Sequence, residues 1–426
     1  MTVRGDRAAA LTATSSSHSP SVSSSVPGST PALDLRRILA DTPAASHRAY
    51  LNNAGAALMP RVVVDTVKAH IDLETTVGGY EAAASAADRH QQVYASVATL
   101  LGASQDEIAL TENATVAWQM AFYALRFAPG DRILTVQAEY AANYVAYLQM
   151  ARRTGVSIEV IPNDTCGQTD VAALARMIDG RVKLISVTWV PTNGGLTNPA
   201  AAIGRIARAA RIPYLLDACQ AVGQMPVDVD ALGCDMLSAT GRKFLRGPRG
   251  TGFLYVRRGM LEQLEPPMID HFAAPWTAVD TYTLRNDARR FETWESNIAA
   301  QLGLGAAIDY AQALGLPAIE ARCHALAQRL RNGLNSLPGV TVHDLGERPS
   351  AIVSFSLPGL AASTVVGFAH QQKIAIGSSD PSSTLLDARA RSLPAVVRAS
   401  PHYYNTETDI DRLVACCDAL LQGTQP

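Results

Sequence analysis

The chain has 426 residues and a formal net charge of −2, and 48% of its residues are hydrophobic while 17% are charged. This composition excludes disorder for the bulk of the chain, and the length exceeds that of a usual single domain, so a large and a smaller domain are expected. The near-neutral charge and the lack of long basic runs argue against nucleic acid or a membrane as partner and favour a small-molecule substrate.

Residues 1–32 are rich in Ser and Ala and include the serine runs 15–17 and 23–25. Because such a segment has little apolar surface to bury, it is predicted to be a disordered tail. A transit peptide is the less favoured alternative, since Arg4 and Arg7 are the only Arg or Lys residues in the segment.

The sequence has neither the apolar core of a secretory signal nor a run near the roughly 20 apolar residues of a transmembrane helix. Its six cysteines have no CxxC spacing and are too sparse for a disulfide framework. Such cysteines are typical of thiols in a reducing compartment. We therefore expect a cytoplasmic protein.

Helical and strand patterns alternate over residues 60–288. Helical periodicity predicts helices at Pro60–Glu74, Ser85–Leu101, Val116–Leu125, Asn143–Thr154, Val171–Ile178 and Pro199–Ala210. β-Branched runs bounded by turn residues predict strands at Arg132–Val136, Ser157–Ile161, Lys183–Val190, Ile212–Asp217 and Gly252–Val256. This alternation predicts βαβ units, and so an α/β large domain with a mainly parallel, doubly wound sheet.

The pattern changes after residue 288, and residues 289–426 are predicted to form a smaller α+β C-terminal domain. Helices are predicted at Ile298–Ala313, Ile319–Leu337 and Asp409–Leu421. Short strands are predicted at Val340–His343, Ala351–Ser356, Lys373–Ile376 and Val396–Ala399.

Asp217 and Lys243 most clearly indicate a chemistry. Ligands of a parallel α/β sheet collect at the carboxyl ends of its strands, where Asp217, Gln220 and Lys243 would lie. Alone, Asp217 could cap a turn and Lys243 could be a solvated surface residue. Together, an Asp for a pyridinium nitrogen and a Lys for a Schiff base predict a site for pyridoxal 5′-phosphate, with Lys243 also the catalytic base at the substrate Cα.

The phosphate of that cofactor needs convergent N–H and hydroxyl donors, such as those of a helix N-terminus. Asn113, Ala114 and Thr115 open the helix that follows the apolar run at residues 108–110, although a plain helix cap would give the same pattern. Thr240 and Arg242 would add a hydroxyl and a guanidinium suited to phosphate.

In this order, the residues resemble fold-type I pyridoxal-phosphate enzymes of the class V aminotransferase group, which includes cysteine desulfurases, selenocysteine lyases and isopenicillin N epimerase-like proteins. The likeness spans about residues 48–420. It implies that Asp217 pairs with the pyridinium nitrogen, that Gln220 bonds to the cofactor O3′ and that Lys243 carries the cofactor. Glu139-Tyr-Ala-Ala-Asn143 falls where the family has a ring-stacking residue, so Tyr140 is expected on the pyridine face.

The resemblance also implies a substrate side. The stretch 397–406 resembles the motif whose Arg binds the substrate α-carboxylate, which makes Arg398 the substrate clamp. Residues 50–55 resemble a motif that reaches the active site, so Asn53 is expected to bind substrate and residues 33–59 to pack on the small domain and the site. Thr192 and Asn193 replace an Asn-containing motif and are further candidates for substrate binding.

A second subunit follows from the same resemblance. Phe291-Glu-Thr-Trp-Glu-Ser-Asn297 resembles the segment through which these enzymes reach the phosphate of the neighbouring subunit. A homodimer with shared active sites is therefore implied, with Ser296 at the cofactor. No metal site is predicted.

The sequence departs from the desulfurases at residues 374–384. Desulfurases carry a nucleophilic Cys on this loop, because a thiolate must attack the substrate sulfur to form a persulfide. Here the loop has no Cys, Cys323 and Cys416 lie in predicted helices remote from it, and Gly377 stands where many desulfurases have a second Arg. A persulfide mechanism therefore has no evident carrier.

The reaction favoured by these features is β-elimination by a carbon–sulfur lyase. Lys243 would remove the Cα proton of an S-substituted cysteine, and a thiol or sulfenate, pyruvate and ammonia would be released. An amino-acid epimerase, an aminotransferase and a decarboxylation-linked deaminase stay open as alternatives, with His402 and Tyr140 as candidate proton donors opposite Lys243. Retention of Lys243, Asp217, Gln220 and Arg398 argues against a protein without catalysis.

Overall fold

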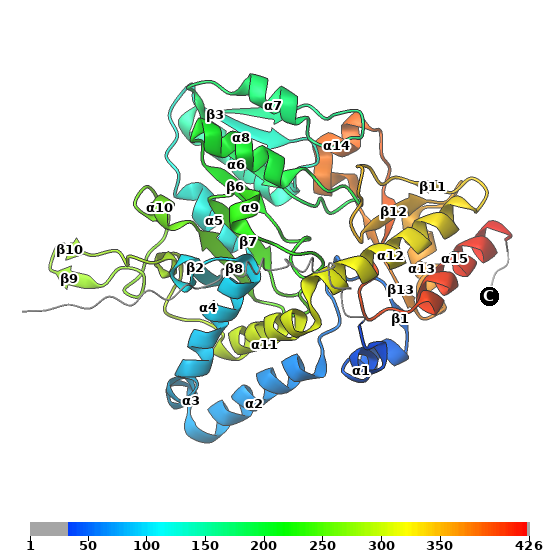
Figure 1. Cartoon of the computed structure of the whole chain (residues 1–426), viewed down its shortest axis with the longest axis horizontal. Coiled ribbons are helices and arrows are strands. Elements are labelled where there is room, and N and C mark those ends of the chain that lie inside the picture. Colours follow the sequence, from blue (N-terminus) through cyan, green and yellow to red (C-terminus); the bar gives the residue numbers. More distant parts are fainter. Residues whose placement is uncertain (1–32, 424–426) are drawn as a thin grey trace, which may run out of the picture. The chain divides into compact units, whose positions relative to one another are not determined.

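A large sheet organises the first part of the computed structural model, which describes residues 33–423 (Figure 1). Its strand order is β2-β8-β7-β6-β5-β3-β4, and every neighbouring pair is parallel except the two pairs that involve β8. The strands are β2 (Ile108–Thr111), β3 (Arg132–Val136), β4 (Ser157–Ile161), β5 (Val182–Thr188), β6 (Tyr214–Asp217), β7 (Met236–Thr240) and β8 (Gly252–Val256). The predicted α/β class with a mainly parallel sheet is confirmed. The predicted N-terminal tail lies outside the described residues.

Both faces of this sheet are buried. Leu215 belongs to one apolar cluster together with Trp118, whereas the next residue, Leu216, belongs to a second cluster together with Ile203. The same alternation holds for the pairs 133/134, 184/185 and 236/237. Because side chains of a strand alternate between faces, burial of both faces requires the nearly continuous apolar runs that this sequence has.

Helices cover each face. On one side lie α5 (Ala114–Tyr123) and α6 (Ala141–Thr154), which contribute to the cluster around Trp118. The other side is covered by α7 (Val171–Met177), α8 (Ala200–Ala210) and α9 (Val229–Leu232). Helices on both faces make the sheet doubly wound, as predicted.

The C-terminal part contains a smaller antiparallel sheet of order β11-β12-β15-β14. Its strands are β11 (Thr341–Val342), β12 (Val353–Ser356), β14 (Gly377–Ser379) and β15 (Val396–Ala399). The helices of this part are α12 (Leu316–Asn335), α13 (Ala362–Gln371), α14 (Leu385–Ala390) and α15 (Glu407–Leu421). The sheet matters for the site because β15 carries Arg398 and β14 lies beside it.

The two parts are joined by packing as well as by the chain. Helix α11 (Ile298–Leu314) follows the predicted boundary at residue 288 and packs on α2 (Arg61–Val77) and α4 (Ala87–Leu101). Strand β1 (Ala49–Tyr50) pairs in parallel with β13 (Ile374–Ala375). The described residues therefore belong to one compact unit.

The remaining elements are short. They are α1 (Leu35–Ala40), α3 (Gly79–Ser85), α10 (Arg258–Leu261) and the hairpin of β9 (Trp276–Ala278) and β10 (Thr281–Tyr282). Short 3-10 helices lie at Pro43–Ser46, Gln105–Glu107, Ala288–Phe291 and Pro381–Thr384. Within the described range, no single helix is long and apolar enough to cross a membrane; α11 and α12 meet that length and composition together but are bent by 82° at their break.

Three predicted boundaries in the large sheet differ from the structure: β5 begins at Val182 and not at Lys183, and β6 begins at Tyr214 and not at Ile212. Strand β5 also ends at Thr188 and not at Val190, because the chain turns out of the sheet before Pro191, which has no N–H for a ladder. Strand β7 had no predicted counterpart, since its small Ser and Ala residues lack the β-branched signature.

Candidate active site

The carboxyl ends of neighbouring strands meet at one edge of the large sheet. Thr188 at the end of β5 is the register partner of Asp217, and Asp217 is the partner of Ser238 in β7. Lys243 follows three residues after the end of β7. The topology therefore brings the predicted Asp and Lys to the same edge, as the sequence pattern indicated.

Asp217 is 6% exposed and its carboxylate is held from two sides. Its Oδ1 accepts the backbone N–H of Cys219 at 3.0 Å, and its Oδ2 accepts a hydrogen bond from Asn143 Nδ2 at 3.1 Å. Nδ2 of Asn143 also donates to Glu139 Oε1 at 3.0 Å. An amide nitrogen with two hydrogens thus bridges two buried carboxylates.

Glu139 is the centre of this network and was not among the predicted site residues. Its carboxylate also accepts hydrogen bonds from Thr135 Oγ1 at 2.8 Å, from the Tyr140 backbone N–H at 2.8 Å and from Thr188 Oγ1. Burial raises the pKa of Glu139, while the donors around it act in the opposite direction and Asp217 adds to the increase. The sequence signal was a Glu and an Asn four residues apart where a strand passes into a helix.

Lys243 is half-buried in a group of charged and polar side chains. Burial lowers the pKa of its amine, Cys219 and Asp217 raise it, and Arg242 and Arg398 lower it further. Within the described part of the chain, none of these three cations makes a salt bridge with a carboxylate; Arg242 donates to a carbonyl, and Arg398 donates to a carbonyl and a hydroxyl. The site therefore has positive charge available for an anionic ligand and an amine with reduced proton affinity.

The N-terminal segment lies across the Lys243 loop. Gln220 Nε2 donates to the Ala54 carbonyl at 3.1 Å, and Arg242 donates to the Gly55 carbonyl. The Ala57 backbone N–H donates in turn to the Arg242 carbonyl at 2.8 Å. These bonds fix the loop between the strand edge and residues 54–57.

The predicted phosphate residues come together at Gly252. In β8, Gly252 is the register partner of Thr111 on one side and of Thr240 on the other. A Cβ at Gly252 would lie 2.8 Å from the Asn113 carbonyl carbon and 3.0 Å from the Ala114 nitrogen. Glycine is therefore needed for the N-terminus of α5 to lie this close to the end of β7.

The side chains around that N-terminus are partly committed. Asn113 caps α5 by accepting the Val116 N–H at 3.0 Å, and Thr240 Oγ1 donates to the Thr251 carbonyl at 3.2 Å. Thr115 is exposed in the first turn of α5. Its hydroxyl and the first N–H groups of the helix are the donors that remain open to an anion.

On the substrate side, Arg398 and Thr192 are paired. Arg398 Nη1 donates to the Thr192 carbonyl at 3.0 Å and to its hydroxyl at 2.6 Å, whereas Arg398 Nε is buried without a partner. Burial lowers the pKa of Arg398 to about 10, and nearby Arg242 contributes, so the guanidinium stays charged at neutral pH. Thr192 thus orients the guanidinium.

The other two substrate candidates have their amides occupied. Asn193 Nδ2 donates to the Asp380 carbonyl at 3.2 Å and to Thr384 Oγ1 at 2.9 Å, and Ser379 donates to its Oδ1. Asn53 is fully buried and bonds to the Ser400 carbonyl and to the Tyr404 hydroxyl. In this arrangement both side chains hold segments together and have no free donor directed at a substrate.

Tyr140 and Ser296 occupy different surroundings. Tyr140 is the N-cap residue of α6 and is 37% exposed. Asp217 and Arg398 lie close enough to affect the pKa of its hydroxyl. Ser296 Oγ lies 3.5 Å from Gln301 Oε1 and lines a separate cavity of about 520 Å³ with Tyr94 and Trp294. Within one chain, Ser296 is thus not grouped with the other predicted cofactor residues.

His402 does not face this site. It is fully buried, Nε2 donates to the Phe244 carbonyl at 2.7 Å, and Nδ1 lies 3.3 Å from the Cys323 sulfur. Burial lowers the pKa of His402 well below its usual value. The structure therefore contradicts its sequence-based assignment as a proton donor to substrate.

Cys219 is a site residue that sequence reasoning missed. It lies two residues after Asp217, and its thiol is close enough to Lys243 for each group to affect the pKa of the other. Burial and then Asp217 raise the pKa of this thiol strongly, so it stays protonated. Its place next to the strand-terminal Asp was the available signal.

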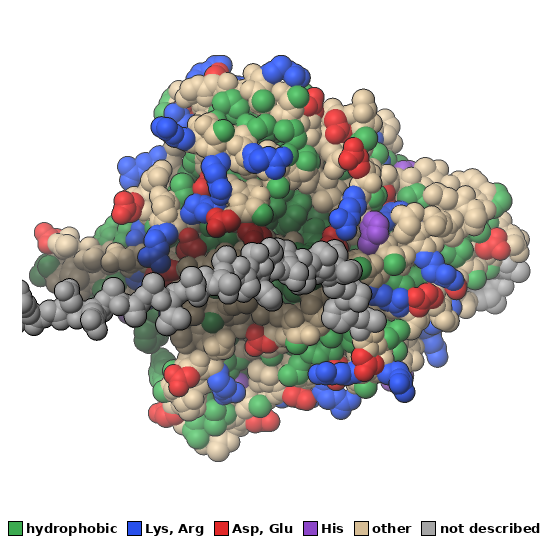
Figure 2. Space-filling view, viewed as in Figure 1, with side chains coloured by type: hydrophobic (Ala, Val, Ile, Leu, Met, Phe, Trp, Pro, Cys, Tyr) green, Lys and Arg blue, Asp and Glu red, His purple; other side chains and the backbone are tan. Residues whose placement is uncertain are grey.

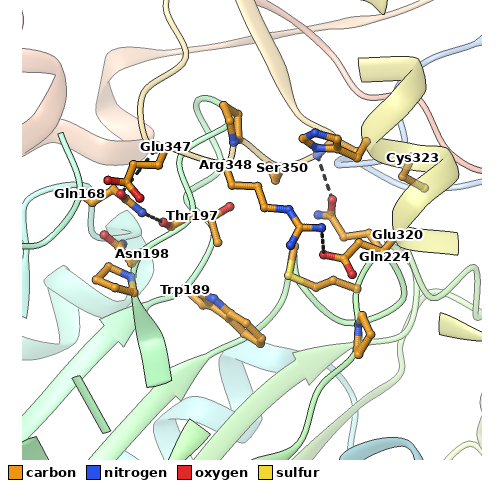
Figure 3. A pocket seen from close by; sticks show the side chains of 16 residues that line it. Gln168, Trp189, Thr197, Asn198, Gln224, Glu320, Cys323, Glu347, Arg348 and Ser350 are labelled. Atoms are coloured by element: carbon orange, nitrogen blue, oxygen red, sulfur yellow. Dashed lines mark hydrogen bonds and ion pairs between the residues drawn. The ribbon is translucent and has the colours of Figure 1, made fainter. Parts of the chain in front are cut away.

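A further cavity of about 410 Å³ lies between the two parts of the chain and contains none of the predicted site residues (Figure 3). Trp189 forms part of its wall, and Arg348 lies across it with Nη2 3.1 Å from Glu320 Oε1. Gln168 Nε2 donates to the Thr197 carbonyl at 2.6 Å on the opposite wall. Among residues 33–423, no cluster of His, Cys, Asp and Glu could hold a metal ion.

Comparison with known proteins identifies the family. The family model described as "Aminotransferase class-V" matches residues 49–413. A cysteine desulfurase from Yersinia pestis is 34% identical over 400 residues, which cover 89% of this chain and 97% of that protein. The structure of the apo form of a cysteine desulfurase from Thermococcus onnurineus superimposes with a TM-score of 0.84 and 27% identity, over 93% of this chain and 100% of that chain.

A third structure has the same fold and contains the cofactor. It is a mutant of C-DES with glycine covalently linked to pyridoxal phosphate, at 22% identity and a TM-score of 0.81 over 89% of this chain and 98% of that chain. The residues present here fit that group: Gln220 Oε1 is buried without a protein partner, and Gly252 lets the N-terminus of α5 lie at the strand edge beside Thr240. Lys243 is also the one lysine among the described residues that is not exposed. The chain belongs to the class-V aminotransferase family of fold-type I enzymes, and its cofactor is pyridoxal 5′-phosphate.

Proposed function

We propose that this enzyme is a carbon–sulfur β-lyase that acts on S-substituted cysteines without forming a protein persulfide. The observation that carries this proposal is the state of the thiols. Residues 374–384 contain no Cys, and the thiol that affects the pKa of Lys243 belongs to Cys219, whose own pKa is raised by burial and by Asp217. Because a thiolate is the form that attacks sulfur, Cys219 is a poor persulfide carrier.

The chain's residues support the first steps of such a reaction. Arg398 holds the substrate carboxylate with the donors that Thr192 does not use. The lowered pKa of Lys243 favours the neutral amine that can accept the Cα proton. Bound pyridoxal phosphate supplies an electron-withdrawing ring that stabilises negative charge at Cα.

Asp217 contributes as a hydrogen-bond acceptor. Asn143 Nδ2 and the Cys219 N–H both donate to its carboxylate, so each Asp217 oxygen already accepts one hydrogen bond and is held in place. The Asp217 carboxylate would accept a hydrogen bond from the protonated ring nitrogen of bound pyridoxal phosphate. Water then completes the overall reaction, in which one S-substituted cysteine and one water give a thiol, pyruvate and ammonium.

No observation favours epimerisation or transamination over elimination. Epimerisation needs a proton donor on the face opposite Lys243, and the ring nitrogens of His402 are engaged away from the site with Phe244 and Cys323. Tyr140 stays at the site, and burial raises the pKa of its hydroxyl. The relatives, which are named cysteine desulfurases, also act at a carbon–sulfur bond, which supports a lyase.

The test is incubation of the holoenzyme with S-ethylcysteine and its sulfoxide in deuterated water. Release of pyruvate with the matching thiol or sulfenate product is the expected result, and Lys243→Ala should abolish it. Incorporation of deuterium at Cα without pyruvate would contradict elimination and support epimerisation or transamination.

A homodimer in a reducing, cytoplasmic environment belongs to the same proposal. The β9–β10 hairpin carries Trp276 and Val279, which are 74% and 92% exposed, and Trp294 beside Ser296 is 54% exposed. Exposed apolar side chains of this size suit a second copy of the chain, and Ser296 would reach the cofactor across that interface. The six cysteines are free thiols, which suits a reducing compartment.

Light scattering coupled to size exclusion tests the dimer. The wild-type protein should elute with twice the mass of the chain, and replacement of Trp276 and Val279 by Ser should shift the equilibrium towards the monomer. A monomeric wild-type protein that holds its cofactor would contradict shared active sites.

On the face drawn in Figure 2, acidic and basic side chains are interspersed. The dimer proposal therefore rests on apolar contacts and not on a charged patch.

A further inference from the structure

Asn52 and Asn53 are neighbours that use their side chains differently. The Asn53 amide is fully engaged with Ser400, Tyr50 and Tyr404. Asn52 Oδ1 is buried without a hydrogen-bond partner, and Asn52 Nδ2 donates to nothing within residues 33–423. An unsatisfied amide at this depth costs free energy. Asn52 is therefore poised for a ligand in a way that Asn53 is not.

Two glycines make room for the Asn52 side chain. A Cβ at Gly377 would lie 3.2 Å from Asn52 Oδ1 and 3.5 Å from Nδ2, and a Cβ at Gly55 would lie 2.9 Å from Oδ1. Neither glycine has a positive φ, so space and not backbone conformation requires them. The C–H groups of both glycines face Oδ1, which leaves Nδ2 as the free donor.

The same geometry brings Asn52 next to Arg398. Gly377 in β14 is the register partner of Arg398 in the antiparallel pair β14–β15. Side chains at paired positions project from the same face of such a sheet. The Asn52 amide, packed against Gly377, therefore lies on the face from which the Arg398 side chain projects.

Arg398 and Asn52 both have N–H donors that make no hydrogen bond within the protein. Thr192 accepts only from Arg398 Nη1, and Arg398 Nε is buried without a partner. A carboxylate has two oxygens and can accept from a guanidinium and an amide at the same time. Gly377 has no side chain to reach the carboxylate. The neutral amide of Asn52, from the N-terminal segment, occupies the space beside it.

We propose that Asn52 determines substrate specificity by donating a hydrogen bond from Nδ2 to the α-carboxylate that Arg398 binds. The inference rests on the amino-acid substrate of the proposed function. The carboxylate is held by one guanidinium and one neutral amide. The site therefore selects α-amino acids with a free α-carboxylate and discriminates against their amides.

The experiment titrates the cofactor-loaded holoenzyme with L-alanine and with L-alaninamide and follows the visible absorbance of the cofactor. Asn52→Ala should weaken the binding of alanine about 10-fold and that of alaninamide by less, because a carboxylate is the stronger acceptor. Asn52→Asp, which sets a negative charge against the carboxylate, should weaken alanine binding further. Ser378→Ala changes the neighbouring position of β14, whose side chain projects from the opposite face, and should alter neither affinity.

Gly377→Ala provides a second test from the other side of the contact. Its Cβ would displace the Asn52 amide, and the same selective loss for alanine should follow. Equal weakening of alanine and alaninamide in both variants, or unchanged alanine binding in Asn52→Ala, would overturn the assignment. A wild-type holoenzyme that responds to neither ligand would overturn the proposed function, and this inference with it.

Discussion

Asn143 Nδ2 lies 3.1 Å from Asp217 Oδ2, and the same nitrogen lies 3.0 Å from Glu139 Oε1. One amide thereby connects the carboxylate expected at the pyridinium nitrogen to a buried carboxylate that had not been recognised. Asp217 Oδ2 and Glu139 Oε1 both accept a hydrogen bond from this nitrogen, so the amide holds the two carboxylates together.

Replacement of Asn143 by Ala should weaken binding of pyridoxal phosphate by about 10- to 100-fold, because a hydrogen bond to a charged buried group is lost. Asn143→Asp should be worse, since it adds a third carboxylate beside Glu139 and Asp217. Fluorescence titration of the apoprotein with the cofactor measures both. Wild-type affinity in Asn143→Ala would mean that the bridge does not support Asp217.

Arg398→Ala should weaken the binding of α-amino acids by about 100-fold, because a charge-assisted contact to the carboxylate is removed. The absorbance spectrum of the resting holoenzyme should stay as in the wild type, since Arg398 is assigned to the substrate and not to the cofactor. Thr192→Val is the matched control: it keeps the guanidinium and removes one of its acceptors, so a smaller loss is expected. A changed resting spectrum in Arg398→Ala would show that this residue is misassigned.

Cys219→Ala should retain lyase turnover. The pKa of the Cys219 thiol is raised by burial and by Asp217, so iodoacetamide at pH 8 should label the exposed Cys166 and leave Cys219 unmodified. Mass spectrometry of peptides from treated protein reads out the labelling. A persulfide on Cys219 after turnover, together with an inactive Cys219→Ala variant, would contradict elimination without sulfur capture.

The buried carboxyl of Glu292 is expected to make the free energy of unfolding depend on pH. Burial raises the pKa of Glu292 to about 7, against the hydrogen bonds from the Leu110 N–H and the Tyr94 hydroxyl, which lower it. Because the folded-state pKa lies above the unfolded value, this stabilisation is complete below the unfolded pKa of about 4.3 and is lost as the pH rises to about 7. Its size is roughly 4 kcal/mol at most.

Glu292→Gln removes this titration, so the stability of the wild type should fall relative to that of the variant between pH 5 and pH 8. Thermal unfolding midpoints of the two holoproteins across that range provide the measurement. Parallel curves for wild type and variant would show that Glu292 does not titrate in this interval.

The sequence was sufficient for the fold class and for the strand edge of the site. The apolar runs at β3, β4 and β8 and the long helices α11 and α12 carry strong periodic signals, and Asp217 and Lys243 follow strands directly. Strand β7 was missed because small residues hide it, although it carries Thr240 and leads to Lys243. The Glu139–Asn143–Asp217 bridge depends on contacts between β3, α6 and β6, which no local pattern contains.

The substrate side was harder to predict for the same reason. Asn53 was the candidate in the N-terminal segment, but the direction of each side chain is set by the bridge between Asn52 and Ser400. That bridge joins residues almost 350 positions apart. The local sequence therefore does not tell which of the two adjacent asparagines is engaged within the fold and which one has a free amide. The tertiary contacts decide it.

Reduction of the holoenzyme with borohydride, followed by peptide mapping, tests the central role of Lys243 most directly. The sequence has four lysines, and Lys68, Lys183 and Lys373 are exposed. The reduced cofactor is expected on Lys243, and Lys243→Ala should carry none. Cofactor attached to one of the three exposed lysines, or an unmodified Lys243 in a protein saturated with cofactor, would contradict it.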